Sequence, residues 1–129
     1  MSREIDFNRI AAVLRRHPQV MAAWVFGSAQ SGVVRPGSDL DIAVLFESKP
    51  DLDEIADLRA DLQEALRFED LDLVVLNGAH PITRFEAVSG KRIYCRDLER
   101  TAGFVSLTAR EYEDVMAFLQ RGLAMMVTR

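Results

Sequence analysis

The chain has 129 residues, of which 49% are hydrophobic and 28% charged, with a formal net charge of -4. This length suits one compact domain, and the composition excludes a disordered chain. The acidic balance disfavours a protein dedicated to nucleic acids or membrane surfaces, because both partners are anionic. Since no leader-like segment and no run of about 18 apolar residues is visible, we expect a cytoplasmic protein that binds neither nucleic acid nor membrane.

The first half of the chain reads as a helix followed by a hairpin. Phe7, Ile10, Val13 and Leu14 recur at helical spacing and predict a helix that stops at His17 and Pro18. The apolar run over 20–26 predicts a buried strand, and 39–46 predicts a second one. Residues 27–38 contain three glycines and a proline, so we expect the two strands to pair around a turn.

The second half alternates helices with strands. Asp51 and Glu54 form a capping pattern before a helix that continues to Leu66. Strands are predicted over 71–76 and 91–95, with a short helix over 81–89 between them. Thr108 with Glu111 is expected to open the last helix. This order predicts one α+β domain over 1–129, with a mixed β-sheet of about four strands and flanking helices.

The stretch richest in chemical information is Gly27-Ser28, ten further residues, and then Asp39-Leu40-Asp41. Alternation along a strand places Asp39 and Asp41 on one face, with their Cα atoms about 6.6 Å apart. Leu40, with the later apolar residues, fills the opposite face and fixes this register. Two converging carboxylates favour a divalent cation such as Mg²⁺ or Mn²⁺, which completes its coordination with phosphate oxygens.

A phosphate also requires hydrogen-bond donors. Gly27 allows close backbone approach, and Ser28 adds a hydroxyl directly after a buried strand. A third carboxylate is needed if both metal binding and proton removal are to be served. Asp72 is the favoured candidate because it interrupts an apolar strand, whereas Asp70 shares its face and stays a competitor.

These residues carry a family resemblance. The segments Val25-Phe26-Gly27-Ser28, Ser38-Asp39-Leu40-Asp41-Ile42-Ala43-Val44 and Leu71-Asp72-Leu73-Val74, with Gly90 before a last strand, resemble the minimal nucleotidyltransferases of the DNA polymerase beta superfamily. The likeness covers a motif core over 20–97 and leaves a C-terminal helical segment over 98–129. It implies the polymerase-beta-like nucleotidyltransferase core.

The resemblance also assigns roles. It implies two magnesium ions, with Asp39, Asp41 and Asp72 as catalytic and metal-binding acids, and a nucleoside triphosphate, ATP, as substrate. We expect Gly27, Ser28, Arg35 and Ser38 to bind the nucleotide. The family commonly carries arginines just after the Gly-Ser pair, but Ala29, Gln30 and Ser31 stand here. Arg35 would then have to supply the phosphate-pairing charge.

Outside the motif the signals are weaker. Trp24 is expected in the core, and Cys95 is given no role. His17 and His80 each precede a proline and are interpreted as ordinary loop residues. Arg92, Arg96 and Arg100 are expected to be solvated. The apolar C-terminal residues, Met116, Phe118, Leu119, Leu123, Met125 and Met126, are compatible with either a core or a contact surface.

Three functions stay open at this stage. The leading one resembles the antitoxin of a HEPN/MNT toxin–antitoxin pair, which transfers AMP from ATP to a tyrosine of its HEPN-type toxin. There Leu123, Met125 and Met126 are expected to hold the toxin, because the chain has too little remaining sequence to enclose an acceptor. The second is a binding module that neutralises its partner by contact alone. The third is a small-molecule nucleotidyltransferase that works as an oligomer.

Overall fold

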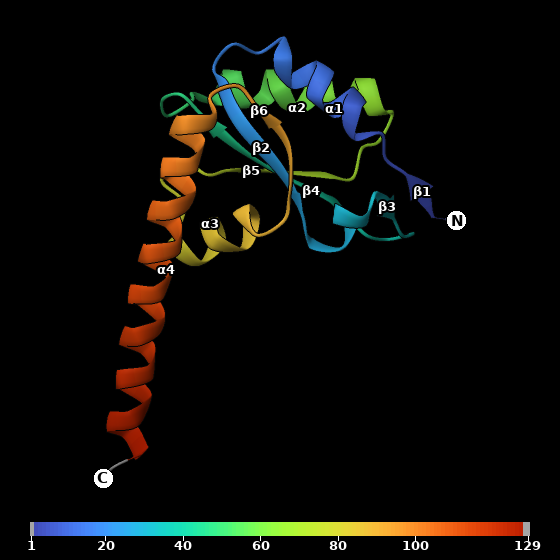
Figure 1. Cartoon of the computed structure of the whole chain (residues 1–129). Helices are drawn as coiled ribbons and strands as arrows, with labels where there is room; N and C mark the ends of the chain where they lie inside the picture. Colours follow the sequence, from blue (N-terminus) through green and yellow to red (C-terminus); the bar gives the residue numbers. More distant parts are fainter. Residues whose placement is uncertain (1, 128–129) are drawn as a thin grey trace.

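The computed structural model describes residues 2–127, which form a mixed four-stranded sheet with two helices against each face (Figure 1). The elements follow in the order β1 (Arg3–Glu4), α1 (Phe7–Arg15), β2 (Val20–Phe26), the 3-10 helix η1 (Gly27–Ser31), β3 (Val33–Val34), β4 (Leu40–Phe46), α2 (Leu52–Leu66), β5 (Leu71–Val75), α3 (Pro81–Val88), β6 (Lys91–Cys95) and α4 (Leu98–Val127). The predicted α+β class and the four-stranded mixed sheet are confirmed.

The sheet has the strand order β5-β4-β2-β6. β2 pairs antiparallel with both β4 and β6, which confirms the expected hairpin of the two buried strands. β4 pairs parallel with β5. A parallel pair needs a long crossover connection, and α2 provides it. Because the pairing is parallel, the N-terminal ends of β4 and β5 lie at the same edge of the sheet.

The two faces of the sheet bury different residues. On one face Leu40, Ile42 and Val44 of β4 pack with α1 and α2, as the alternation predicts. On the other face Ala43 and Leu45 join Trp24 in a second cluster, which α3 and α4 cover through residues that include Ala87 and Phe104. Trp24 is buried, so its predicted core position is confirmed. Asp39 and Asp41 share the alternation of Ala43 and therefore belong to the α3/α4 face.

Capping residues explain where the helices begin. Asp6 accepts hydrogen bonds from the first turn of α1, and Asp51 accepts one from the backbone N–H of Glu54 at 2.8 Å. The expected start of the last helix at Thr108 is wrong. α4 begins ten residues earlier at Leu98, where the Asp97 carboxylate accepts from the Arg100 backbone N–H at 3.0 Å. Thr108 is instead buried within the helix.

The short strands β1 and β3 were not predicted. Each has two residues, and together they form a separate antiparallel sheet. Two residues are too few to show the alternation that identifies a strand in a sequence. β3 and the turn at residues 35–38 divide the loop that was expected between the buried strands.

Several polar residues expected to be free have partners. His17 lies in a loop, as predicted, but its Nε2 is 2.7 Å from Asp61 Oδ2 on α2. His80 caps α3, because its Nδ1 accepts from the Ile82 backbone N–H at 3.1 Å. Arg96 and Arg100 are not simply solvated, since both form ion pairs with Glu47. Cys95 is a free cysteine in β6.

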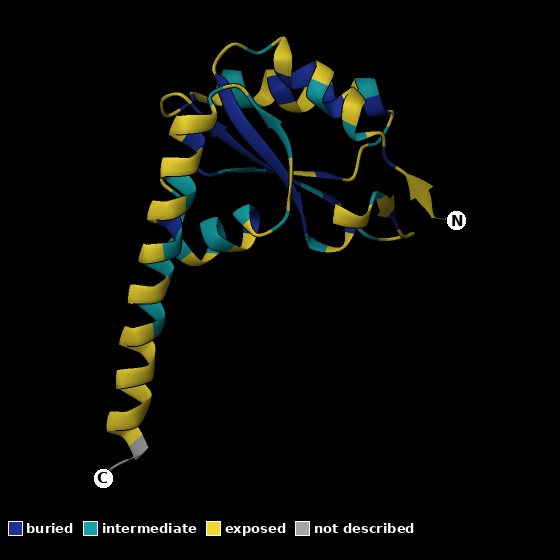
Figure 2. Ribbon diagram, in the orientation of Figure 1, coloured by how far each residue is buried: buried dark blue, intermediate teal, exposed yellow. Residues whose placement is uncertain are grey.

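The C-terminal part of α4 projects away from the sheet, beyond α3 (Figure 1). Figure 2 shows that this part is exposed on all sides, whereas the earlier part of α4 contributes buried or half-buried residues to the domain. Of the described helices, none combines the length and the apolar composition needed to cross a bilayer, although α4 spans 30 residues.

Candidate functional site

Two neighbouring strand ends bring the predicted acids together. Asp39 stands immediately before β4, Asp41 is the second residue of β4, and Asp72 is the second residue of β5. The parallel register pairs Asp41 directly with Asp72. Residues that face each other in this register project to the same side of the sheet. The three acids therefore gather at one edge of the α3/α4 face.

Gly27 closes the site from the side of β2. Phe26, the last residue of β2, pairs with Asp41, and Gly27 follows it with a positive φ of 71°. A Cβ atom added at residue 27 would stand 2.7 Å from Oδ2 of Asp41. Glycine is thus required here both by the left-handed backbone and by the close approach to a carboxylate. Gly27 and Asp41, which thirteen residues separate in the sequence, therefore lie side by side in the fold.

The site carries excess negative charge. The pKa of Asp41 is raised above its ordinary value, first by burial and then by repulsion from Asp72, Asp39 and Glu86. Within residues 2–127, no arginine, lysine or histidine forms an ion pair with the three aspartates. The charge is therefore left for a bound cation or for a proton to compensate.

Glu86 is a fourth acid that the sequence did not reveal. It lies on α3, is exposed, and contributes to the raised pKa of Asp41. It reaches this region through the packing of α3 on the second face of the sheet, and no spacing rule within the motif marks it.

Gly90 is a second glycine that the fold requires, because a Cβ there would stand 2.4 Å from the Val25 carbonyl oxygen. Its lack of a side chain lets the α3–β6 turn pack against β2.

The predicted nucleotide-binding residues lie on two loops around the acids. Ser28 is exposed in η1, where Gln30 also donates from Nε2 to the Gly27 carbonyl at 3.1 Å. Ser38 is half-buried, and its N–H donates to the Arg35 carbonyl at 3.0 Å in the turn before β4. The Arg35 side chain is exposed, and it is not among the charges that act on Asp41.

Asp70, the competitor for the third acid, lies just outside β5. Its carbonyl accepts from the Leu40 backbone N–H at 2.9 Å, while its side chain is exposed. Asp72, in contrast, pairs with Asp41 and raises the pKa of that carboxyl. The structure therefore brings Asp72 together with the other two aspartates and leaves Asp70 at the rim.

The donor set fits a divalent cation that is completed by a ligand. Carboxylate oxygens are the hard donors that Mg²⁺ and Mn²⁺ prefer, and the unpaired charge around Asp41 favours a cation. Among the described residues, no group of three or more acidic, histidine or cysteine side chains is arranged to hold a metal by itself. Magnesium commonly takes one or two carboxylates and fills its remaining positions with phosphate oxygens and water, which matches this arrangement.

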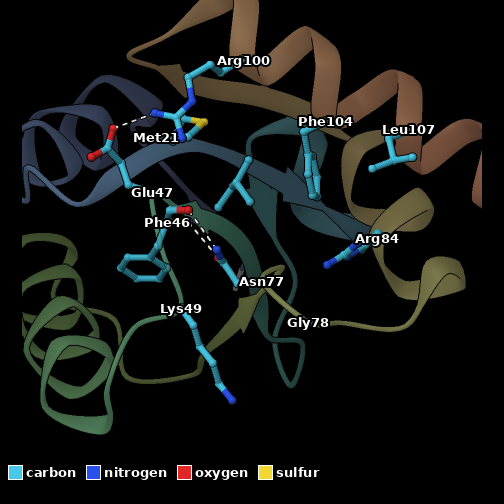
Figure 3. Close-up of a pocket in the computed structure, with 11 residues that line it drawn as sticks. Met21, Phe46, Glu47, Lys49, Asn77, Gly78, Arg84, Arg100, Phe104 and Leu107 are labelled. Carbon is cyan, nitrogen blue, oxygen red and sulfur yellow. Dashed lines mark hydrogen bonds and ion pairs between the residues drawn. The ribbon is translucent and has the colours of Figure 1, made fainter.

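A separate cavity of about 490 Å³ lies at the other end of the same strands (Figure 3). Its lining includes Phe46 at the end of β4, Glu47 directly after it, Asn77 beyond β5, and Phe104 of α4. The Asn77 side chain holds the Phe46 backbone through two hydrogen bonds of 2.9 Å. None of the predicted site residues lines this cavity, so the acids and the cavity are distinct features.

Comparison with solved structures gives full-length similarity. A toxin–antitoxin MntA–HpeT complex with two aspartate-to-glutamate substitutions has a chain 26% identical to this one, with a TM-score of 0.80, covering 96% of this chain and 100% of that one. A toxin–antitoxin solved with AMP-PNP is 27% identical, with a TM-score of 0.77 and the same coverage. No curated protein matches the chain.

A third similar structure holds a tri-AMPylated Shewanella oneidensis HEPN toxin with its MNT antitoxin. It is 26% identical, with a TM-score of 0.71, and covers 95% of this chain and 96% of that one. Residues 8–99 match the family described as Polymerase beta, Nucleotidyltransferase. This match includes Gly27, Asp41, Asp72 and Gly90. The chain belongs to the polymerase beta nucleotidyltransferase family.

Proposed function

We propose that this protein transfers AMP from ATP to a tyrosine of a HEPN-type toxin and acts as the toxin's antitoxin. The observation that carries the proposal is the contact of Gly27 with Asp41, which is itself paired with Asp72. This arrangement occurs in a chain that matches antitoxin structures over nearly its whole length, one of them solved with an AMPylated toxin.

The acids are suited to both metal binding and proton removal. Asp39 and Asp41 would hold Mg²⁺ at the edge of the sheet, and Asp72 would complete the set. When bound, the metal supplies positive charge to the phosphates of ATP. Asp39 and Asp72 are both exposed, so an incoming hydroxyl can reach either of them. Because Asp39 is assigned to the metal, Asp72 is our candidate for the general base.

The chemical step follows from these positions. The tyrosine oxygen forms a bond to the α-phosphorus of ATP, and the bond from that phosphorus to the bridging oxygen of the β-phosphate breaks. The hydroxyl proton passes to Asp72, and pyrophosphate leaves. Gly27 and Ser28 offer backbone N–H groups and a hydroxyl to the phosphates. Arg35 and Ser38 stand on the second loop, from which the arginine can pair with a phosphate oxygen.

One observation favours the alternative of a binding module without catalysis. The residues after Gly27 and Ser28 carry no positive charge, and Arg35, in the turn before β4, is exposed and does not act on Asp41. In that case the nucleotidyltransferase fold would serve only as a scaffold for contact with the toxin. The two functions differ in whether neutralisation of the toxin depends on the acids.

The test uses the product of the reading frame adjacent to this gene, which the proposed function requires to be a HEPN-type toxin. That product is incubated with this protein, ATP and magnesium, and its intact mass is measured. We expect an added AMP, located on a tyrosine by fragmentation, and no adduct with the Asp39→Asn, Asp41→Asn double variant. If the double variant neutralises the toxin fully and the unsubstituted protein leaves no adduct, the binding module is correct and catalysis is rejected.

A further inference from the structure

The most unusual surface of the molecule is the projecting end of α4. We define the overhang as residues 118–126. Its large apolar residues are 45% to 74% exposed, and they are Phe118, Leu119, Leu123, Met125 and Met126. Soluble monomers rarely expose so many large apolar side chains together unless the surface binds something. Within residues 2–127, no other element covers these five apolar side chains.

The apolar face of the overhang continues the face that packs on the domain. Thr108 is buried, and Tyr112 and Val115 are half-buried, at helical spacing along α4. Leu119 and Met126 follow at the same spacing, on the same side of the helix. The face of α4 that packs on the domain therefore continues into the overhang with large apolar residues. Within the described residues, no other element covers this part of the face.

α3 connects this face with the acids. The Phe85 ring stacks on the Tyr112 ring of α4, with the centroids 3.9 Å apart and the planes at 8°. After burial and the repulsion from Asp72 and Asp39, the negative charge of the next residue, Glu86, also raises the pKa of Asp41. One short helix thus separates the root of the overhang from the acids. The acids, α3 and α4 all lie on the same face of the sheet.

We infer that the overhang is the docking surface for the HEPN-type toxin, through contacts with an apolar surface of that partner. This inference rests on the proposed function, which supplies the toxin. A partner that covers the inner face of the overhang lies beside α3, on the side of the sheet where Asp41 and Asp72 stand. Docking there would bring an acceptor hydroxyl of the toxin close to the acids. A second copy of this chain in the same place would not be required to supply an acceptor.

The full-length similarity supports this occupant. The MntA–HpeT chain aligns with 96% of this chain and over 100% of its own length. Only a few residues of this chain can then fall outside the shared fold, so most of the overhang belongs to it. A feature that this domain shares with chains solved beside a toxin is suited to binding one.

The test compares two charge-matched variants. Leu119→Glu with Met126→Glu places two charges in the centre of the apolar face, whereas Ala117→Glu with Gln120→Glu places two on the exposed polar side. Affinity for the adjacent reading frame's product is measured by calorimetry without nucleotide. We expect the first pair to weaken binding at least tenfold and the second pair to leave it within about twofold. Circular dichroism and magnesium-dependent ATP binding check that both variants keep the domain intact.

The outcomes separate the possible occupants. Unchanged toxin binding by the Leu119→Glu, Met126→Glu pair would overturn the inference. So would sedimentation that shows a dimer of the unsubstituted protein which this pair dissociates, because the overhang would then join two copies. A complex that forms through the overhang but yields no AMP adduct would reject the proposed catalysis and keep the docking surface. Absence of any complex with the unsubstituted protein would reject both.

Discussion

Gly27 lies against the carboxylate of Asp41, so closely that a Cβ atom at residue 27 would stand 2.7 Å from Oδ2. Its φ of 71° adds a second requirement for glycine. We predict that Gly27→Ala lowers AMP transfer by roughly a hundredfold, because it displaces the carboxylate from its position beside the phosphates. Turnover is measured with thermal unfolding, and Gly78→Ala is the control.

Gly78, which follows β5 away from the acids, also has a positive φ, of 79°, but a Cβ there meets nothing within 4 Å. Its substitution therefore introduces backbone strain without touching a carboxylate. Equal loss of activity in the two variants would show that backbone strain at a glycine is enough to reduce activity, and that the close approach to Asp41 is not the cause.

Asp41→Asn is predicted to separate activity from stability. It removes a metal-binding charge, so AMP transfer falls by about a hundredfold or more. It also removes the cost of burying a charge and the repulsion from Asp72 and Asp39, so the metal-free variant is expected to unfold at a higher temperature than the unsubstituted protein at pH 7. Thermal scans with chelator test this directly.

The pH dependence of that stability difference follows from the raised pKa of Asp41. A raised pKa means that the charged carboxylate opposes folding, and this penalty applies at pH values above the pKa. As the pH falls through the pKa, Asp41 is protonated and the advantage of asparagine should disappear. If the difference in melting temperature between Asp41→Asn and the unsubstituted protein grew toward acidic pH, it would contradict the conclusion that the charged Asp41 carboxylate opposes folding.

Asp72→Asn and Asp70→Asn distinguish the two candidates for the third acid. Asp72 pairs with Asp41, whereas Asp70 lies outside β5 with an exposed side chain. We expect Asp72→Asn to reduce kcat by about a hundredfold with a smaller change in ATP affinity, since a general base acts on the chemical step. Asp70→Asn should stay within about twofold of the unsubstituted protein. The reverse order would move the third acid to Asp70.

Metal removal should abolish nucleotide binding. The aspartates are unpaired among the described residues, and the ATP phosphates would be repelled by this charge without a cation. Calorimetry is expected to show ATP binding with magnesium or manganese and at least tenfold weaker binding with chelator. Equal affinity under both conditions would mean that the carboxylates do not hold the metal that accompanies ATP.

A stability prediction concerns the contact of α4 with the domain. Thr108 is buried, and its hydroxyl has no hydrogen-bond partner among the described residues. Thr108→Val removes the unsatisfied group and keeps the shape, so we expect unfolding to require about 1 kcal/mol more. Thr108→Ser keeps the hydroxyl and loses a methyl group, so it should be destabilising by about 1 kcal/mol. Chemical denaturation of both variants measures the difference.

The sequence predicted the motif well because local rules govern each part of it. Alternation fixed Asp39 and Asp41 on one face, and the Gly27 turn was recognisable from its place after a buried strand. The helix between the two strands was predicted from its capping and spacing, but no local pattern indicates the parallel register that pairs Asp41 with Asp72. Glu86 reaches the site only because α3 packs on the sheet, and no pattern in the neighbouring sequence indicates this position. The start of α4 was misplaced because Thr108 and Glu111 resemble a cap, whereas Asp97 is the residue that caps the helix.

The overhang of α4 also affects how long the free protein survives. Residues 118–126 are exposed throughout, so this part of the helix gains little stability from packing on the described domain. Local unfolding of such a segment requires little free energy, and proteases cut chains that unfold locally. A copy without its partner would be trimmed there first, keeping its acids but losing its apolar surface, while a partner seated on the overhang would protect it. The abundance of the protein would then follow the abundance of what it binds.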